Sequence, residues 1–149
     1  SKKVDQDNAV TIYEIESRIR NPAMNDDNNK KYQRTLSNAL YEFMGQPDKL
    51  NELSKLVGKL RFASEGWEGF YDRAMIEEVE SEILSLSMYL PDKYKIQAVM
   101  QSAKLWSDSG SVLTQLYLER CYKLYEEDYI ELQKIEDKIK WFESHHDQL

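Results

Sequence analysis

The chain has 149 residues with a formal net charge of −7, 41% hydrophobic and 32% charged residues, five Gly, three Pro and one Cys. This length suits one domain, and high charge with few Gly and Pro favours a helical bundle over a turn-rich β-sandwich or barrel. The negative charge counts against nonspecific binding to nucleic acid or anionic membranes, and the single cysteine excludes an intramolecular disulfide and a cysteine-based zinc site.

Three helices are predicted in the first half of the chain. After a flexible N-terminus over residues 1–7, a helix over residues 8–20 should end before Pro22, because the residue preceding a proline disfavours helical geometry. A second helix is predicted from about residue 27 to 44, where Gly45 suits the left-handed position after a helix. Pro47 opens a third helix with an apolar stripe of Leu50, Leu53, Leu56, Val57 and Leu60. Gly58 in this helix either lets another helix approach closely or is tolerated without a role.

The second half predicts a fourth helix over residues 67–90, a fifth over residues 91–106 and a long C-terminal helix over residues 111–143, capped by Ser111 after a turn at residues 107–110. The connections are short, so successive helices should pack antiparallel, and no sheet is expected. The predicted fold is therefore all-α: about six helices in a mostly antiparallel bundle, forming a single helical domain over residues 1–149.

The C-terminal helix carries an apolar stripe at helical spacing. The members that we predict as a protein interface are Tyr122, Tyr125, Tyr129, Leu132, Ile135, Ile139 and Phe142. An unbroken helix here would be roughly 50 Å long, whereas a compact chain of this size is roughly 38 Å across. The helix therefore either overhangs as a coiled-coil-like association arm or breaks near Glu126–Asp128, where Asp128 is able to cap a second segment. The stripe alone leaves open whether the tyrosines are interface or core.

No pattern in the sequence is typical of a catalytic or metal centre. Glu143 and His146 have the spacing of a carboxylate–histidine pair, but the only other histidine is the adjacent His145, so a paired di-metal motif cannot be built. Cys121 lies beside the apolar stripe, far from either histidine, and is better explained as a buried apolar residue than as a nucleophile. We predict no catalytic residue, no cofactor and no metal, and an enzyme with a carboxylate metal site inside the bundle is the last of the alternatives.

The function predicted from these observations is a non-enzymatic interaction or assembly protein that self-associates, or binds a partner protein, through the C-terminal helix. No membrane association is expected, because the longest apolar runs are far below the roughly 20 residues of a membrane span. The lack of a basic and then apolar opening segment predicts no signal peptide, and the single cysteine fits an intracellular, cytoplasmic location. A bias toward Asn, Asp, Lys, Tyr and Ile resembles coding by an AT-rich genome, which suggests an accessory factor of a phage, a virus in its host cytoplasm, or a low-GC bacterium.

The alternative function is an accessory factor of nucleic-acid metabolism. It would use a local basic face on the second and third predicted helices, formed by Lys30, Lys31, Arg34, Lys55, Lys59 and Arg61. Phosphate binding through such a face should weaken steeply with ionic strength, whereas apolar association should not.

Overall fold

The computed structural model describes residues 26–65, 72–105 and 107–145, and the helix predicted over residues 8–20 lies outside these ranges. The described residues form six α-helices and one 3₁₀ turn, with no β-strand among them, which confirms the predicted all-α class. Contacts divide the chain into two compact units, Ser1–Leu40 and Tyr41–Leu149. The single domain over residues 1–149 stays a prediction.

The described part of the first unit lies in helix α2 (Asp26–Phe43), whose bounds differ by one residue at each end from those predicted. The left-handed conformation predicted for Gly45 is wrong, because its φ is not positive and its carbonyl accepts from the Lys49 N–H at 3.0 Å, at the start of the next helix. Leu36 and Leu40 of this helix are exposed. The last residues of α2 belong to the second unit, where Tyr41 is buried and its ring lies edge-on to Tyr89 at a centroid distance of 6.1 Å.

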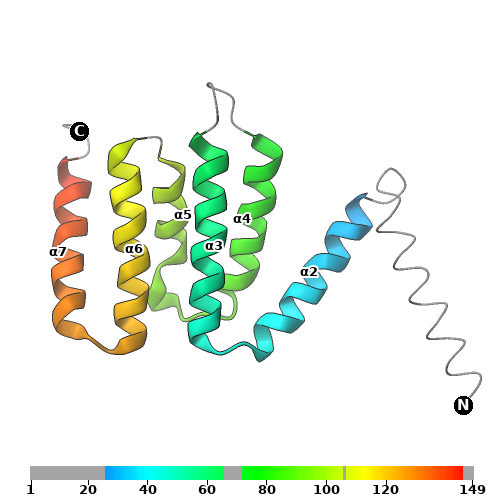
Figure 1. The fold of residues 1–149 in the computed structure, drawn as a ribbon, viewed down its shortest axis with the longest axis horizontal. Helices are drawn as coiled ribbons and strands as arrows, with labels where there is room; N and C mark the ends of the chain where they lie inside the picture. The colour runs from blue at the N-terminus through cyan, green and yellow to red at the C-terminus, as the bar shows by residue number, and fades with distance from the viewer. Residues whose placement is uncertain (1–25, 66–71, 106, 146–149) are drawn as a thin grey trace, which may run out of the picture. The chain divides into compact units, whose positions relative to one another are not determined.

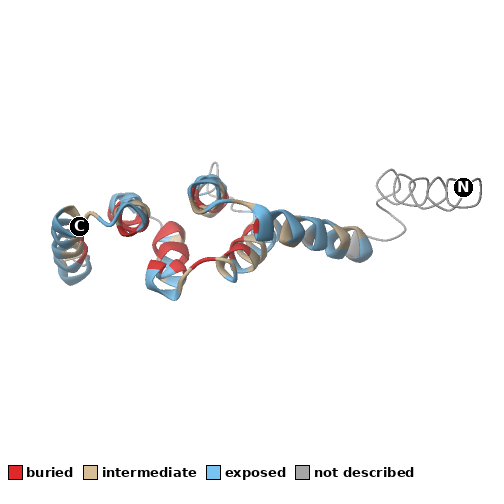
Figure 2. Ribbon diagram, turned by 90° about the horizontal axis from the view of Figure 1, so that it is seen from below, coloured by how far each residue is buried: buried red, intermediate tan, exposed pale blue. Residues whose placement is uncertain are grey.

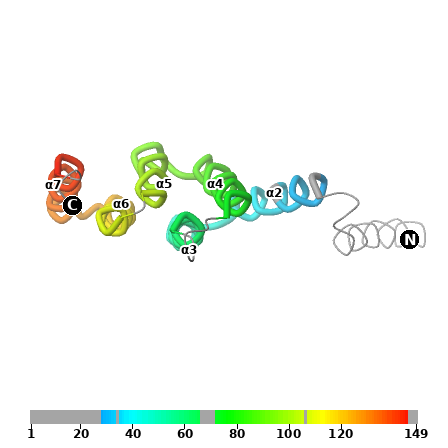
Figure 3. Tube along the Cα trace, turned by 90° about the horizontal axis from the view of Figure 1, so that it is seen from above, coloured from blue at the N-terminus to red at the C-terminus, as the bar shows by residue number. Residues whose placement is uncertain are grey.

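The second unit is a bundle of helices α3 (Gln46–Glu65), α4 (Arg73–Ser87), α5 (Ile96–Lys104), α6 (Asp108–Glu126) and α7 (Tyr129–His145) (Figure 1). Helices that follow one another in the sequence run antiparallel, as predicted. Seen from above in Figure 3, α3 and α6 form one layer of this bundle and α4, α5 and α7 form the other. Helix α3 packs against α4, α5 and α6, and α6 packs in addition against α5 and α7.

The core of this bundle is built around α3. All five residues of its predicted apolar stripe are buried: Leu50, Leu53, Leu56, Val57 and Leu60. Ile83 of α4, Val99 of α5 and Cys121 of α6 are also completely covered, and Figure 2 shows the buried residues on the inner sides of the helices. Because α3 contacts three neighbouring helices, its whole stripe is covered.

The predicted fifth helix over residues 91–106 is wrong in its first turn. The structure has a 3₁₀ turn at Asp92–Tyr94, then Lys95 in the left-handed conformation with φ 51°, and only then α5. Tyr94 and Ile96 are both buried, yet residues two apart point to opposite sides of a continuous helix. The break at Lys95 lets both side chains enter the core, and the Tyr94 hydroxyl donates to Gln46 Oε1 at 2.8 Å.

The continuous helix over residues 111–143 is not present, and the alternative of a break is confirmed. Helix α6 ends at Glu126, Glu127 adopts the left-handed conformation with φ 58°, and α7 begins at Tyr129. The Asp128 carboxylate accepts from the Glu131 backbone N–H at 3.2 Å, so Asp128 caps α7 as expected. The two shorter helices fold back on each other as a hairpin, which removes the overhang that an unbroken helix would have produced.

Helices α4 and α6 also begin at other residues than predicted. Asp72 caps α4 by accepting from the Met75 backbone N–H at 3.0 Å, and residues 66–71 lie outside the described ranges. Ser107 rather than Ser111 caps α6, because its hydroxyl accepts from the Gly110 N–H at 3.1 Å. A Cβ on Gly110 would stand 2.2 Å from the Leu105 carbonyl oxygen, so the close approach of α5 to the start of α6 requires a glycine there.

Candidate protein-binding surfaces

The predicted interface stripe of the C-terminal hairpin divides into a buried and an exposed part. Ile135 and Ile139 of α7 are each 6% exposed and belong to the core of the bundle, so the chain itself covers them. Three members are partly buried against that core: Tyr122, Leu132 and Phe142. Tyr125 and Tyr129 are exposed, at 43% and 61%. The stripe is therefore mainly core in the middle of α7 and exposed only near the α6–α7 turn.

Polar contacts also hold the hairpin against the bundle. The buried Arg120 of α6 binds Glu136 of α7 at 3.2 Å and donates to the Lys93 carbonyl at 2.7 Å, which joins α6, α7 and the 3₁₀ turn. Toward the other end of α7 the Tyr117 hydroxyl donates to Glu143. Burial, and then this hydrogen bond, raises the pKa of Tyr117 well above its ordinary value, which keeps the phenol protonated. Helix α7 is thus a packed helix of the bundle and not a free arm.

An exposed apolar cluster remains where the hairpin turns. Tyr125, Tyr129 and Ile130 lie within six residues on either side of the turn, and Ile130 is 76% exposed. We call these three residues the hairpin-end surface. Ile130 was not part of the predicted stripe, because a stripe drawn through one continuous helix does not describe a turn between two helices.

Cys121 is a core residue, as predicted. Its side chain is completely buried, and the sulfur lies 3.4 Å from the Tyr94 carbonyl oxygen. Burial raises the pKa of the Cys121 thiol to about 11, although the positive charge of Arg120 opposes this shift. A thiol that stays protonated and out of contact with solvent is a poor nucleophile.

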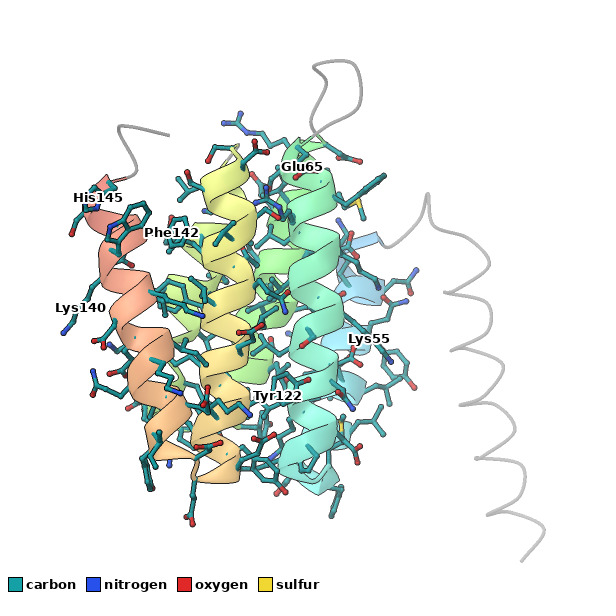
Figure 4. The ribbon with its side chains drawn as sticks, turned by 60° about the vertical axis from the view of Figure 1, so that its left-hand side comes forward. Lys55, Glu65, Tyr122, Lys140, Phe142 and His145 are labelled. Carbon is teal, nitrogen blue, oxygen red and sulfur yellow. The ribbon has the colours of Figure 1, made fainter. Side chains whose placement is uncertain are left out.

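A groove runs between α3 and α6 on the layer that these two helices form. It has a volume of about 410 Å³, and its wall includes Ser54, Gly58 and Arg61 from α3 and Leu118, Glu119 and Tyr122 from α6. At one end the Tyr122 hydroxyl, which Figure 4 labels, donates to Asn51 Oδ1 of α3 at 3.0 Å. At the other end Arg61 donates to the carbonyls of Leu105 and Ser107 and pairs with Glu65 at 3.0 Å. Both ends are closed by hydrogen bonds, whereas the middle of the groove is open at Gly58.

Gly58 and Phe62 form a second feature of the same face of α3. A Cβ built on Gly58 would meet no atom within 4 Å, so no described helix of the chain approaches closely there. One turn further along α3, Phe62 is 73% exposed. We call Gly58, Phe62 and the adjoining groove the α3 surface. Phe62 falls off the Leu50–Leu60 stripe on the helical wheel, and this position is the sequence feature that would have identified it as exposed.

The predicted basic residues are not described as one face. Lys30 and Lys31 lie in the first unit on α2, as does Arg34, whose side chain is outside the described residues. Lys55 and Lys59 are exposed on α3 in the second unit, and Arg61 is held there by two carbonyls and Glu65. A common surface of all six residues therefore stays a prediction.

Comparisons with models of protein families, with curated proteins and with solved structures give no match to this chain. Within the described ranges, no group of three or more His, Cys, Asp or Glu side chains is placed to hold a metal ion, and His146 lies outside these ranges. None of the described helices is long and apolar enough to cross a membrane. The exposed surfaces of the bundle are thus the features of the described residues that bear on function.

Proposed function

We propose that this chain is a non-enzymatic interaction protein that associates with a second protein chain, in the first place with a copy of itself, through exposed apolar side chains of the helical bundle. The observation that carries the proposal is the exposure of Phe62, Tyr129 and Ile130 on helices whose inner stripes are already buried. Burying such side chains against a partner removes apolar area from water, at about 25 cal/mol per Å².

The aromatic character of these positions supports the proposal further. Tyrosine and other aromatic residues are enriched at protein interfaces, because the ring is buried well while the Tyr hydroxyl stays in contact with water. Large apolar side chains that stand singly on a surface are common. Tyr129 and Ile130 instead lie together beside the turn of the hairpin, and Phe62 lies one helical turn from Gly58, which lines the groove.

Nucleic-acid binding finds less support as a function. Of the predicted basic residues in the second unit, Arg61 already donates to backbone carbonyls and pairs with a carboxylate. The net charge of −7 also opposes the approach of a polyanion. The salt dependence of any binding separates the two functions, because apolar association is insensitive to ionic strength.

The test is the molar mass in solution, measured by light scattering after size exclusion at several concentrations. The expected result is a mass that rises above that of the 17.7 kDa chain and persists at high salt. A variant with Phe62→Ala, Tyr129→Ser and Ile130→Asp combined should stay at the monomer mass while its helical circular dichroism is unchanged, because all three side chains are exposed. A mass of one chain for the unmodified protein at every concentration would refute self-association.

A further inference from the structure

We infer that two copies of this chain pair through α3 around a twofold axis, so that Phe62 of each copy enters the other copy's groove at Gly58. This inference rests on the proposed self-association and specifies its surface and its partner. Four described residues of α3 would form the contact: Lys55, Gly58, Phe62 and Glu65.

These four residues lie on one side of α3. They are spaced three, four and three residues apart, which places them within an arc of about 80° at 3.6 residues per turn. All four are exposed. Figure 4 shows Lys55 near the middle of α3 and Glu65 at its upper end. Among the described residues, this side of the helix is thus exposed along about three turns.

Shape complementarity comes from Phe62 and Gly58. A twofold axis at the level of Leu60 places Phe62 opposite Gly58 of the second copy, because each residue lies two positions from the axis. Gly58 has no side chain and open space above it, and the groove beside it has a volume of about 410 Å³. The exposed ring of Phe62 is thus placed opposite Gly58, where the absence of a side chain lets the ring approach the backbone.

Charge complementarity follows from the same register. Lys55 and Glu65 each lie five positions from the axis, on opposite sides of it, so Lys55 of one copy meets Glu65 of the other at both ends of the contact. Glu65 pairs with Arg61 of its own chain at 3.0 Å and is half exposed, so Lys55 of the second copy would join this existing pair. Opposite charges that face each other across an interface fix its register and discriminate against wrong pairings. The register needed by Phe62 and Gly58 is therefore also the one that pairs the two charges.

The register brings no competing repulsion into the centre of the contact. It places Lys59 at the level of Arg61, but these two residues lie beyond opposite edges of the arc, about 160° apart around the helix. Arg61 is only 15% exposed, and its guanidinium donates to the carbonyls of Leu105 and Ser107. The contact is short, so we expect a dimer with a dissociation constant on the order of micromolar.

The first experiment tests the apolar contact with single substitutions. Phe62→Ala should weaken the dimer more than a hundredfold, because it removes two buried rings per dimer. Met88→Ala is the matched control: Met88 is even more exposed than Phe62 but lies at the end of α4, away from this face. It should leave the dissociation constant unchanged. The inference would be overturned if both substitutions changed the dissociation constant equally, or if neither changed it.

The second experiment tests the register with charge reversal. Lys55→Glu and Glu65→Lys each place like charges at both ends of their own homodimer, and each variant alone should dimerise about tenfold more weakly or worse. Mixed in equal amounts, the two variants should form a heterodimer tighter than either variant's homodimer, because every Lys55–Glu65 position then carries one acid and one base. It should stay weaker than the unmodified dimer, because Glu65→Lys also removes the pair between Arg61 and Glu65. Circular dichroism and thermal unfolding of each variant check that the bundle stays folded.

The outcomes separate the inference from the proposed function. A dimer that neither Phe62→Ala nor charge reversal affects would overturn pairing through α3 and leave self-association in place, with the hairpin-end surface as its location. Mixed variants that associate no more tightly than either variant alone would overturn the antiparallel register. A chain that is monomeric at every concentration would refute the proposed self-association and this inference with it.

Discussion

Replacing Gly58 by alanine should stabilise the monomeric chain and at the same time weaken its self-association. Glycine in a helix interior is about 1 kcal/mol less favourable than alanine. The new methyl group would meet no atom of the described chain within 4 Å, so no strain offsets this gain. For a chain of this size, about 1 kcal/mol corresponds to a rise in Tm of roughly 3–5 °C. In the dimer the same methyl group would stand where the ring of Phe62 from the second copy enters, so the dissociation constant should increase at least tenfold.

Gly110→Ala is the matched control for this substitution, and it should act in the opposite direction. Its methyl group would stand 2.2 Å from the Leu105 carbonyl oxygen and 2.8 Å from Leu105 Cβ. Overpacking of this kind costs about 1–3 kcal/mol, and loss of the cap between Ser107 Oγ and the Gly110 N–H costs about 1 kcal/mol. The gain in helix propensity offsets up to about 1 kcal/mol of this sum. The net loss should therefore be about 1–3 kcal/mol.

The assay for both variants is urea unfolding followed by circular dichroism, at a concentration low enough to keep the chain monomeric. The two glycine substitutions are chemically identical, so the difference between them reports only on the surroundings of the two positions. A lower free energy of unfolding for Gly58→Ala would show that the site above Gly58 is filled, and would refute the reasoning on which the α3 surface depends. An unchanged free energy for Gly110→Ala would refute the close approach of α5 to α6.

Three further predictions concern the C-terminal hairpin. Arg120→Met removes the ion pair with Glu136 and should lower the free energy of unfolding by about 2 kcal/mol, which is less than for a fully buried pair because Glu136 is one-third exposed. A loss below about 0.5 kcal/mol in urea unfolding would contradict a stabilising role of the ion pair. Burial raises the pKa of Cys121 to about 11 and also raises that of Tyr117, so the unfolded chain releases protons above about pH 9 that the folded chain retains. The free energy of unfolding in urea should therefore fall as the pH rises from about 9 to 11. A profile that stays flat over this range would contradict the burial of these groups. Asp128→Ala should cost about 1 kcal/mol and speed amide hydrogen exchange in the first turn of α7; unchanged exchange there would show that the cap contributes nothing.

The helices that bury one regular stripe are those that the sequence predicted well. The α3 stripe from Leu50 to Leu60 is buried as expected, since α3 has neighbours on several sides and helical periodicity describes its environment. The second predicted helix is found within one residue of its expected ends. The predicted reason is wrong, because Gly45 does not adopt a positive φ and its carbonyl instead accepts from the Lys49 N–H at the start of α3. Local patterns are sufficient where a single helix face determines the outcome.

The two helix breaks were harder to predict, because neither is marked by Gly or Pro. Lys95 and Glu127 both adopt positive φ, which is uncommon for residues with a side chain. At Lys95 the reason is tertiary: Tyr94 and Ile96 both enter the core. At Glu127 only the capping residue Asp128 was visible in the sequence. A short stretch with a period of two, such as Tyr94 and Ile96, is the pattern that would have revealed the first break.

The candidate surfaces could not be predicted from the spacing of apolar residues along a single helix. Ile135 and Ile139 were predicted at an interface and are buried against the bundle, because apolar stripes facing the chain itself and stripes facing a partner have the same spacing. Phe62 was not predicted at an interface because it lies off the α3 stripe. The open space above Gly58 became visible only once the neighbouring helices had been placed.

The most direct test of self-association is the molar mass of the unmodified chain in solution, measured by light scattering over a wide concentration range at low and high salt. We expect a mass that rises from 17.7 kDa toward twice that value with concentration. High salt should weaken this association only slightly, because exposed ion pairs contribute little beside buried apolar groups. A mass that remains at that of one chain under all these conditions would contradict self-association.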